Sequence, residues 1–177
     1  MKRILLFSLL LFVLTWSASA QQAKGASAKP NPEAEVRAAF ERLNEGIRQV
    51  DVSKVMSVYD NNERTLFFNN NGSVTLGWNQ MRENRQSLYA KTKNVSLETT
   101  GVRVEMLGAR SAYVSYKWKQ SQEFDGKLET ASGRTTLIFT KIGKDWKIVH
   151  SHVSPDNPPA TRPVLESERQ RIEPGFP

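Results

Sequence analysis

The sequence has 177 residues, no cysteine and a formal net charge of +7. A chain of this length can bury one sizeable core without covalent cross-links. The absence of cysteine excludes disulfide bridges and thiolate metal sites. Basic residues are scattered among acidic ones, which argues against nucleic acid as a partner.

Residues 1–20 have the pattern of a secretory signal peptide. Lys2 and Arg3 precede an apolar run from Ile4 to Leu14, and small residues at 18–20 form a cleavage site. The run is shorter than the roughly 20 residues that a membrane-spanning helix needs. We therefore expect cleavage before Gln21, a secreted or periplasmic protein, and no membrane association after cleavage. An uncleaved membrane anchor is the alternative.

Three helices are expected after a flexible leader over residues 21–32. Asn31 and Pro32 are a capping residue and a first-turn proline, and apolar residues then recur every three or four positions up to Ile47. A shorter helix is expected over Val52–Tyr59. The third is expected over Trp78–Ala90, with Trp78, Met81 and Arg85 along one face.

The rest of the chain alternates between apolar and polar residues, which indicates strands with two different faces. The expected strands are Thr65–Phe68, Val102–Met106, Val114–Trp118, Gly133–Lys141 and Trp146–Val153. Gly101 is expected to form a bulge that bends the sheet. Residues 142–145 are expected to form a four-residue hairpin loop.

This order of elements predicts an α+β fold. We expect a cone-shaped, curved antiparallel sheet of about four to six strands, wrapped on three N-terminal helices within one domain over residues 33–154. Four prolines between Pro155 and Pro163 predict a mostly extended C-terminal tail over residues 155–177.

The last hairpin predicts a pocket. If Lys141 pairs with Trp146, then Leu137 lies opposite His150 and Thr135 lies opposite His152. Residues two apart on a strand share a face, so both histidines would lie on one face, which we take to be the concave one. The residues expected to contact a ligand there are Tyr59, Trp78, Met81, Tyr116, Trp118, Thr135, Leu137, His150 and His152.

The sequence leaves open whether this pocket carries out catalysis. His150, His152 and Asp60 are the candidate acid–base residues, because histidine titrates near neutral pH and carboxylates can act as bases. The alternatives are a hydrogen-bonded core role for His150, a position at the pocket rim for His152 and a turn role for Asp60. A His-x-His pair can chelate a metal, but the sequence offers no identifiable third ligand, so neither a metal nor another cofactor is expected.

Two segments, Ser132–Lys141 and Asp145–Ser154, carry a family resemblance. They are similar to the end of the SnoaL-like domain in the nuclear transport factor 2-like superfamily, where a Gly turn precedes Trp-x-x-x-His-x-His-x-Ser. The resemblance implies a cone of antiparallel strands on three helices, often dimeric through the sheet. The superfamily also includes ketosteroid isomerase and the association domain of the calmodulin-dependent kinase. The kinase domain has pocket arginines where this chain has Trp118 and Leu137, which favours an apolar ligand.

Three functions remain open at this stage. The first is an exported domain that binds a small, largely apolar ligand. The second is an isomerase, cyclase or dehydratase that uses a pocket histidine with Asp60 or a tyrosine. The third is a dimeric scaffold without a ligand. A homodimer is expected through the sheet face that carries Tyr113, Ser115, Val149 and Val153.

Overall fold

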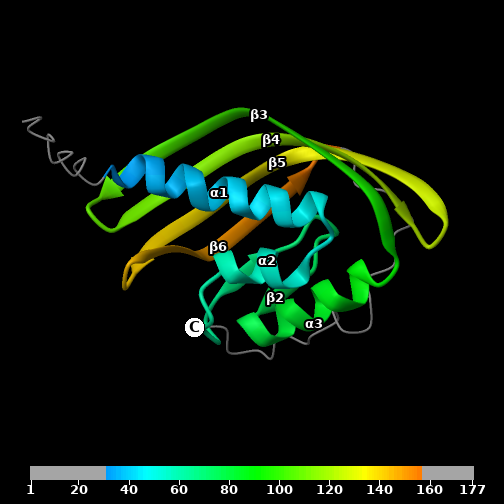
Figure 1. Cartoon of the computed structure of the whole chain (residues 1–177), viewed down its shortest axis with the longest axis horizontal. Coiled ribbons are helices and arrows are strands. Elements are labelled where there is room, and N and C mark those ends of the chain that lie inside the picture. The colour runs from blue at the N-terminus through cyan, green and yellow to red at the C-terminus, as the bar shows by residue number, and fades with distance from the viewer. Residues whose placement is uncertain (1–30, 157–177) are drawn as a thin grey trace, which may run out of the picture. The chain divides into compact units, whose positions relative to one another are not determined.

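The computed structural model describes residues 31–156 (Figure 1). The predicted signal peptide, the leader up to residue 30 and the tail from residue 157 lie outside the described residues. The elements are α1 Pro32–Arg48, α2 Val52–Val58, β1 Leu66–Phe68, β2 Val74–Leu76, α3 Trp78–Tyr89, β3 Thr92–Gly108, β4 Ser111–Phe124, β5 Lys127–Ile142 and β6 Asp145–Pro155. The described part is thus a mixed α+β fold, as predicted. None of its helices is both long and apolar enough to cross a membrane.

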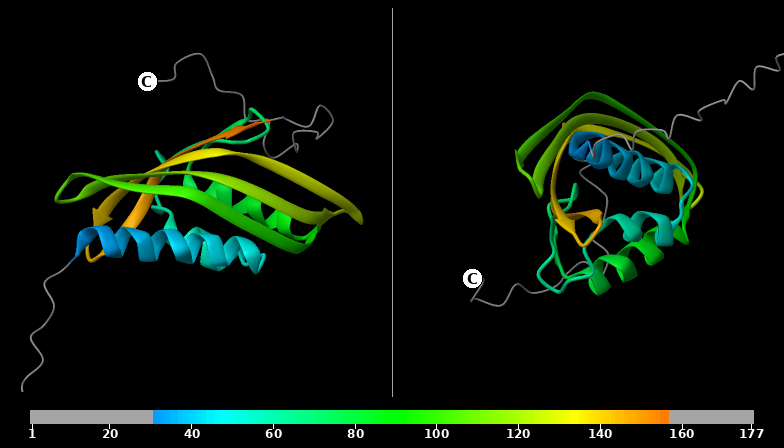
Figure 2. Two further views of the ribbon diagram at one scale, coloured as in Figure 1. Left: turned by 90° about the horizontal axis from the view of Figure 1, so that it is seen from above. Right: turned by 60° about the vertical axis from the view of Figure 1, so that its left-hand side comes forward.

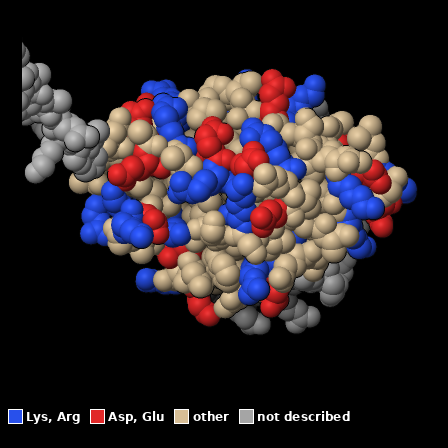
Figure 3. All heavy atoms as spheres, viewed as in Figure 1, with Lys and Arg blue, Asp and Glu red and all other residues tan. Residues whose placement is uncertain are grey.

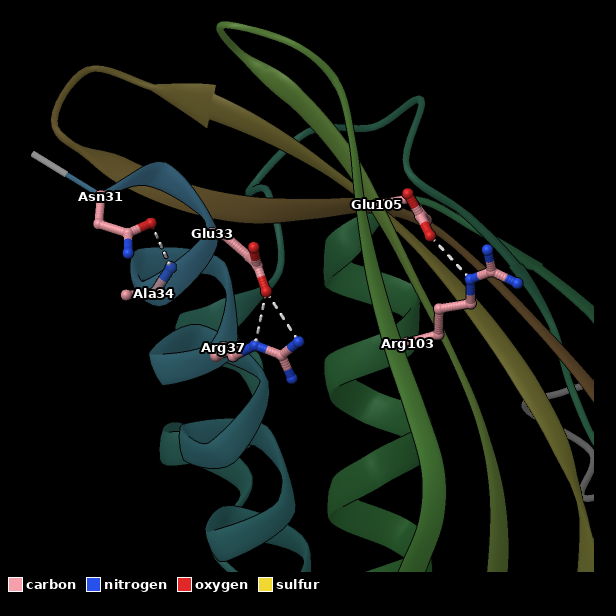
Figure 4. A network of polar contacts seen from close by, with 6 residues as sticks. All are labelled: Asn31, Glu33, Ala34, Arg37, Arg103 and Glu105. Atoms are coloured by element: carbon pink, nitrogen blue, oxygen red, sulfur yellow. Dashed lines mark hydrogen bonds and ion pairs between the residues drawn. The ribbon is translucent and has the colours of Figure 1, made fainter.

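Short-range capping fixes where the helices begin. The Asn31 side chain accepts a hydrogen bond from the Ala34 N–H at 3.2 Å (Figure 4), and Asp51 accepts one from the Lys54 N–H at 2.9 Å at the start of α2. These bonds satisfy backbone donors that a helix start leaves without an intrahelical partner. Gly77 begins α3 with a φ of 88°, a conformation that glycine adopts without steric cost.

Six strands form one sheet in the order β2-β1-β6-β5-β4-β3. Neighbouring strands are antiparallel except β1 and β6, which run parallel. A register shift between Thr100 and Arg103 surrounds Gly101, which has a φ of 60°, so the predicted bulge is present. Figure 2 shows the sheet curling around α1. The sheet therefore has a concave face toward the helices and an outer face away from them.

The core lies between the concave face and the helices. Its largest fully buried side chains include Phe40 and Leu43 of α1, Phe139 of β5 and Ile148 of β6. Burying each such side chain stabilises the fold by about 1.5–3 kcal/mol. Gly46 lets α1 approach α2, because a Cβ there would lie 2.9 Å from the Val55 side chain.

A polar clamp joins the start of α1 to the β5–β6 hairpin. Glu35 Oε2 accepts hydrogen bonds from Lys141 Nζ at 2.6 Å and from the indole N–H of Trp146 at 2.8 Å. These two bonds, with a smaller contribution from the Lys141 charge, lower the Glu35 pKa. The buried Trp146 thereby finds an acceptor for its only donor.

The structure changes several expected boundaries. Strand β2 was not expected, and β3, β4 and β5 are longer than their apolar cores suggested. Asp125 and Gly126 form a two-residue hairpin loop with φ values of 51° and 77°. Lys141 does pair with Trp146, but Ile142 also pairs with Asp145, so the last loop has two residues rather than four.

The visible surface carries both signs of charge. In Figure 3, lysine and arginine are interspersed with aspartate and glutamate over the described residues of this face. Some of them form exposed pairs, such as Arg37 with Glu33 at 2.8 Å and Arg103 with Glu105 at 2.7 Å (Figure 4). Exposed pairs of this kind contribute little to stability.

Candidate functional site

A bulge in β6 decides which side chains reach the interior. Phe139 pairs with Ile148, whereas the preceding residue, Ile138, pairs with His150. Val149 is the extra residue, and one extra residue reverses the face of everything after it. Ser151 consequently lies opposite Leu137, and Val153 lies opposite Thr135. The expected pairings of Leu137 with His150 and of Thr135 with His152 are wrong.

Both histidines lie on the outer face of the sheet. Their imidazole rings pack edge-on against Phe68, with ring centroids 5.4 Å away for His150 and 5.3 Å for His152. His150 is half-buried and His152 is exposed. Burial lowers the pKa of His150, an effect opposed by a backbone hydrogen bond at Leu66. Trp118 faces the interior, so the predicted pocket position of both histidines is corrected.

Asp60 and Trp78 also lie outside the lining of the cavity described next. The Asp60 N–H donates to the Ile148 carbonyl at 2.9 Å, and its own carbonyl accepts from the Thr65 hydroxyl at 3.1 Å. The Trp78 indole donates to the Met56 carbonyl at 3.1 Å. In these contacts Asp60 forms a turn and Trp78 ties α3 to α2, and neither acts at the predicted pocket.

A cavity of about 420 Å³ lies between the helices and the concave face of the sheet. Six of the nine residues expected to contact a ligand line it: Tyr59, Met81, Tyr116, Trp118, Thr135 and Leu137. Val153 lines it as well, which corrects its expected place on the outer, dimerising face. The volume falls in the range of small-molecule sites, roughly 300–1,000 Å³.

The inner part of the cavity is apolar. Leu43 and Ile47 of α1, Phe67 of β1 and Leu97 of β3 complete this wall. The Tyr116 ring packs edge-on against Phe40 at 4.8 Å, and Tyr59 packs against Phe67 at 5.0 Å. These contacts hold both tyrosine rings in place from the side of the core.

Tyr59 and Tyr116 supply buried phenol groups. Burial raises the pKa of both, so both are neutral hydrogen-bond donors at physiological pH. The Arg85 charge opposes this rise in each case. A hydrogen bond with Ser151 also lowers the Tyr59 pKa, and one with Thr135 lowers that of Tyr116.

The outer part of the cavity is more polar. Gln120 donates to Gln122 at 2.7 Å, and Gln122 donates to the Glu129 carboxylate at 3.3 Å. Along β4, Trp118 lies between Tyr116 and the two glutamines. Its indole N–H is buried without an acceptor among the described residues. The cavity therefore changes from apolar to polar along the strands.

Sequence reasoning placed Met81 of α3 at the pocket but did not include Arg85 among the residues expected to contact a ligand. Arg85 and Tyr89 follow Met81 at successive spacings of four residues, and all three line the cavity. The shared face of Trp78, Met81 and Arg85 was predicted from the sequence, but only Trp78 and Met81 were expected to contact a ligand. The i, i+4 spacing from Met81 was the signal that could have identified Arg85.

Solved structures share this architecture. A nuclear transport factor 2-like superfamily protein from Salmonella enterica is 21% identical, with a TM-score of 0.63, and the match covers 76% of this chain and 95% of that one. A ketosteroid isomerase-like protein from Erwinia carotovora atroseptica is 15% identical, with a TM-score of 0.62 and coverage of 71% and 97%. A Streptomyces avermitilis protein named provisionally as a dehydratase of the same family is 18% identical, with a TM-score of 0.62 and coverage of 70% and 94%. At these identities the similarity shows the fold.

The sequence itself matches a family model. No curated protein matches the chain, but the model of the SnoaL-like domain matches residues 36–158. This span holds all three helices but the first turn of α1, all six strands and every described residue that lines the cavity. The chain therefore belongs to the SnoaL-like domain family.

Proposed function

We propose that this protein binds a small, largely apolar organic molecule in the cavity under the curved sheet. The observation that carries the proposal is the cavity itself, about 420 Å³ and lined in part by residues of the hydrophobic core. Protein interiors are close-packed, so a hollow of this size is unusual in a purely structural core. An apolar wall with a few polar groups is typical of ligand sites.

A scaffold without a ligand fits less well. That alternative predicts no usable cavity, whereas aromatic side chains of Tyr59, Phe67, Tyr116 and Trp118 surround this one. Large rings give a ligand apolar contact area at low cost in side-chain entropy. Two of these rings are held by aromatic packing, Tyr116 against Phe40 and Tyr59 against Phe67.

Catalysis is the second candidate, and the two neutral phenols favour it. Tyr59 and Tyr116 could donate hydrogen bonds to a carbonyl oxygen and stabilise charge that develops there. An isomerase or dehydratase also needs a base close to the reacting atoms. Among the described lining residues the only carboxylate is Glu129, which is engaged by Gln122. Binding without catalysis is therefore the better-supported proposal.

Export and self-association complete the proposal. The signal-peptide pattern of residues 1–20 supports a secreted or periplasmic location. Tyr113, Ile138 and His150 are neighbours across three strands of the outer face and are only half-buried. A partly apolar sheet face of this kind suits a two-fold contact, so we propose a homodimer through it.

The binding proposal is tested with two probes that share one ring system, uncharged 2-naphthamide and anionic 2-naphthoate. Calorimetric titration of the purified protein should show binding of at least one probe. Ala131→Trp should abolish it, because Ala131 lines the cavity opposite Gln120 and a large ring there fills the space. Arg134→Trp, on the exposed face of the same strand, is the matched control and should bind normally. Failure of both probes to bind, or binding unaffected by Ala131→Trp, contradicts the proposal.

A further inference from the structure

The lining of the cavity contains one positive charge. Among the described lining residues Arg85 is the only lysine or arginine, and Glu129 is the only acid. Arg85 is half-buried on α3, the helix that lies across from the concave face in Figure 1. Its guanidinium carbon lies 5.4 Å from the centre of the Tyr89 ring, one turn further along the helix. Tyr89 thus supports the arginine at the cavity wall.

The Arg85 charge acts on both buried phenols. It lowers the pKa of Tyr59 and that of Tyr116, in each case against the larger effect of burial. All three side chains line the same cavity and come from different elements, Tyr59 from the end of α2, Tyr116 from the middle of β4 and Arg85 from α3. Three hydrogen-bond donors from three elements thus line one cavity.

The negative charge lies at the other end. Glu129 pairs with Gln122, which is six residues beyond Tyr116 on β4. At about 3.3 Å per residue this separation is roughly 20 Å along the strand. Repulsion between Glu129 and an anion beside Tyr116 is therefore weak, because the Coulomb energy falls in inverse proportion to distance. The cavity is electrostatically polarised along its length.

From this arrangement we infer that the ligand is an organic carboxylate with an apolar body, its carboxylate held by Arg85 and by the hydroxyl groups of Tyr59 and Tyr116. The inference rests on the proposed function and specifies the ligand class for the same cavity. A planar guanidinium matches the two oxygens of a carboxylate, and hydrogen bonds to an ionised acceptor are about twice as strong as neutral ones. The apolar body lies against Leu43, Phe67 and Leu137.

This ligand class differs from the expectation drawn from the sheet alone. Trp118 and Leu137 stand where the kinase association domain has arginines, and that comparison favoured an apolar ligand. The structure places the cation on α3 instead, where it reaches the cavity from the helical side. The sheet residues then provide the apolar surface and the helix provides the charge.

The experiment compares the affinities of 2-naphthoate and 2-naphthamide for the purified protein by calorimetry at pH 7. The two probes have the same ring and differ in charge. The wild-type protein should prefer 2-naphthoate by about tenfold or more, the value of one charge-assisted contact. Arg85→Gln should abolish this preference by weakening 2-naphthoate far more than 2-naphthamide. Arg85→Lys should keep part of it, because charge remains but the planar fork is lost.

Two further variants make the result specific. Arg82→Gln removes an exposed cation from the same helix, over the Trp78 ring and outside the cavity, and should keep the full preference. Tyr116→Phe removes one donor and should reduce the preference, which provides a second test if Arg85→Gln does not fold. Equal binding of both probes to the wild type, or a preference that persists in Arg85→Gln, overturns the inference and leaves the proposed function standing. Binding of neither probe contradicts the proposed function itself.

Discussion

Ser151 of β6 lies directly opposite Leu137 of β5, and both side chains face the cavity. This pairing follows from the bulge at Val149 and sends His150 and His152 to the outer face. The last strand therefore contributes a hydroxyl and a valine to the cavity rather than two imidazoles. Any chemistry in the cavity has to use the phenols, Arg85 or Glu129 among the described lining residues.

Gly133 should be intolerant of any side chain. A Cβ at this position would lie 2.8 Å from the Trp118 ring and would collide with the Ser154 carbonyl oxygen. Neither the sheet backbone nor the buried indole can move away cheaply. Gly133→Ala should lower the free energy of unfolding by about 1–3 kcal/mol, measured by urea denaturation.

Gly108→Ala is the matched control for that change. A Cβ at Gly108 meets no atom within 4 Å, so the stability should stay within about 0.5 kcal/mol of the wild type. Equal effects of the two substitutions would show that the contact between Trp118 and Gly133 is not tight.

The Glu35 clamp should make stability depend on acidic pH. Its hydrogen bonds with Lys141 and Trp146 lower the Glu35 pKa from its ordinary 4.5. The unfolded chain then takes up the proton more readily, so this contribution is present above about pH 4.5 and is lost as the pH falls below it. The melting temperature of the wild type should fall between pH 5 and pH 3, and that of Glu35→Gln should fall less over the same range.

Lys141→Met tests the same clamp from the other side. Removing the ammonium group should also weaken the dependence of the melting temperature on pH. The double variant of Glu35→Gln and Lys141→Met should show little further change, because both residues act in one interaction. Fully additive effects of the two substitutions would contradict the clamp.

The outer face should carry the dimer contact. Ile138→Glu places a charge among Tyr113 and His150, where a self-contact would exclude water, so it should produce monomers. Leu107→Glu, at a residue that is 63% exposed near the β3–β4 turn, should leave the dimer intact. Light scattering at tens of micromolar distinguishes the two, and a monomeric wild type would reject the dimer.

Export should remove the first twenty residues of the chain. Intact mass spectrometry of protein collected outside the cytoplasm should give a mature chain beginning at Gln21. A mass that still includes residues 1–20 would contradict cleavage at this site.

The sequence was sufficient for the helices, the α+β class and the Gly101 bulge, because capping, spacing and glycine act locally. It also placed Tyr116 and Trp118 on the concave face correctly, since alternation along an uninterrupted strand preserves the face. His150 and His152 were misplaced because a single unpaired residue, Val149, reverses the face of the strand after it. No local sequence pattern predicted this bulge, because its position depends on how two whole strands pair.

Arg85 shows a different limit. Its helical face was predicted, but its role depends on how α3 packs across the sheet, which is a property of the tertiary structure. A cation at i+4 from a buried methionine is equally consistent with an exposed helix edge. Only its place in the cavity lining, together with Tyr59 and Tyr116, distinguishes the two interpretations.

A crystal structure of the protein with 2-naphthoate tests the central claim most directly. The account predicts ligand density within the cavity, with the ring against Leu137 and the carboxylate beside Arg85 and Tyr116. Density on the outer face against His150 and His152, or an empty cavity in a saturated crystal, would contradict it.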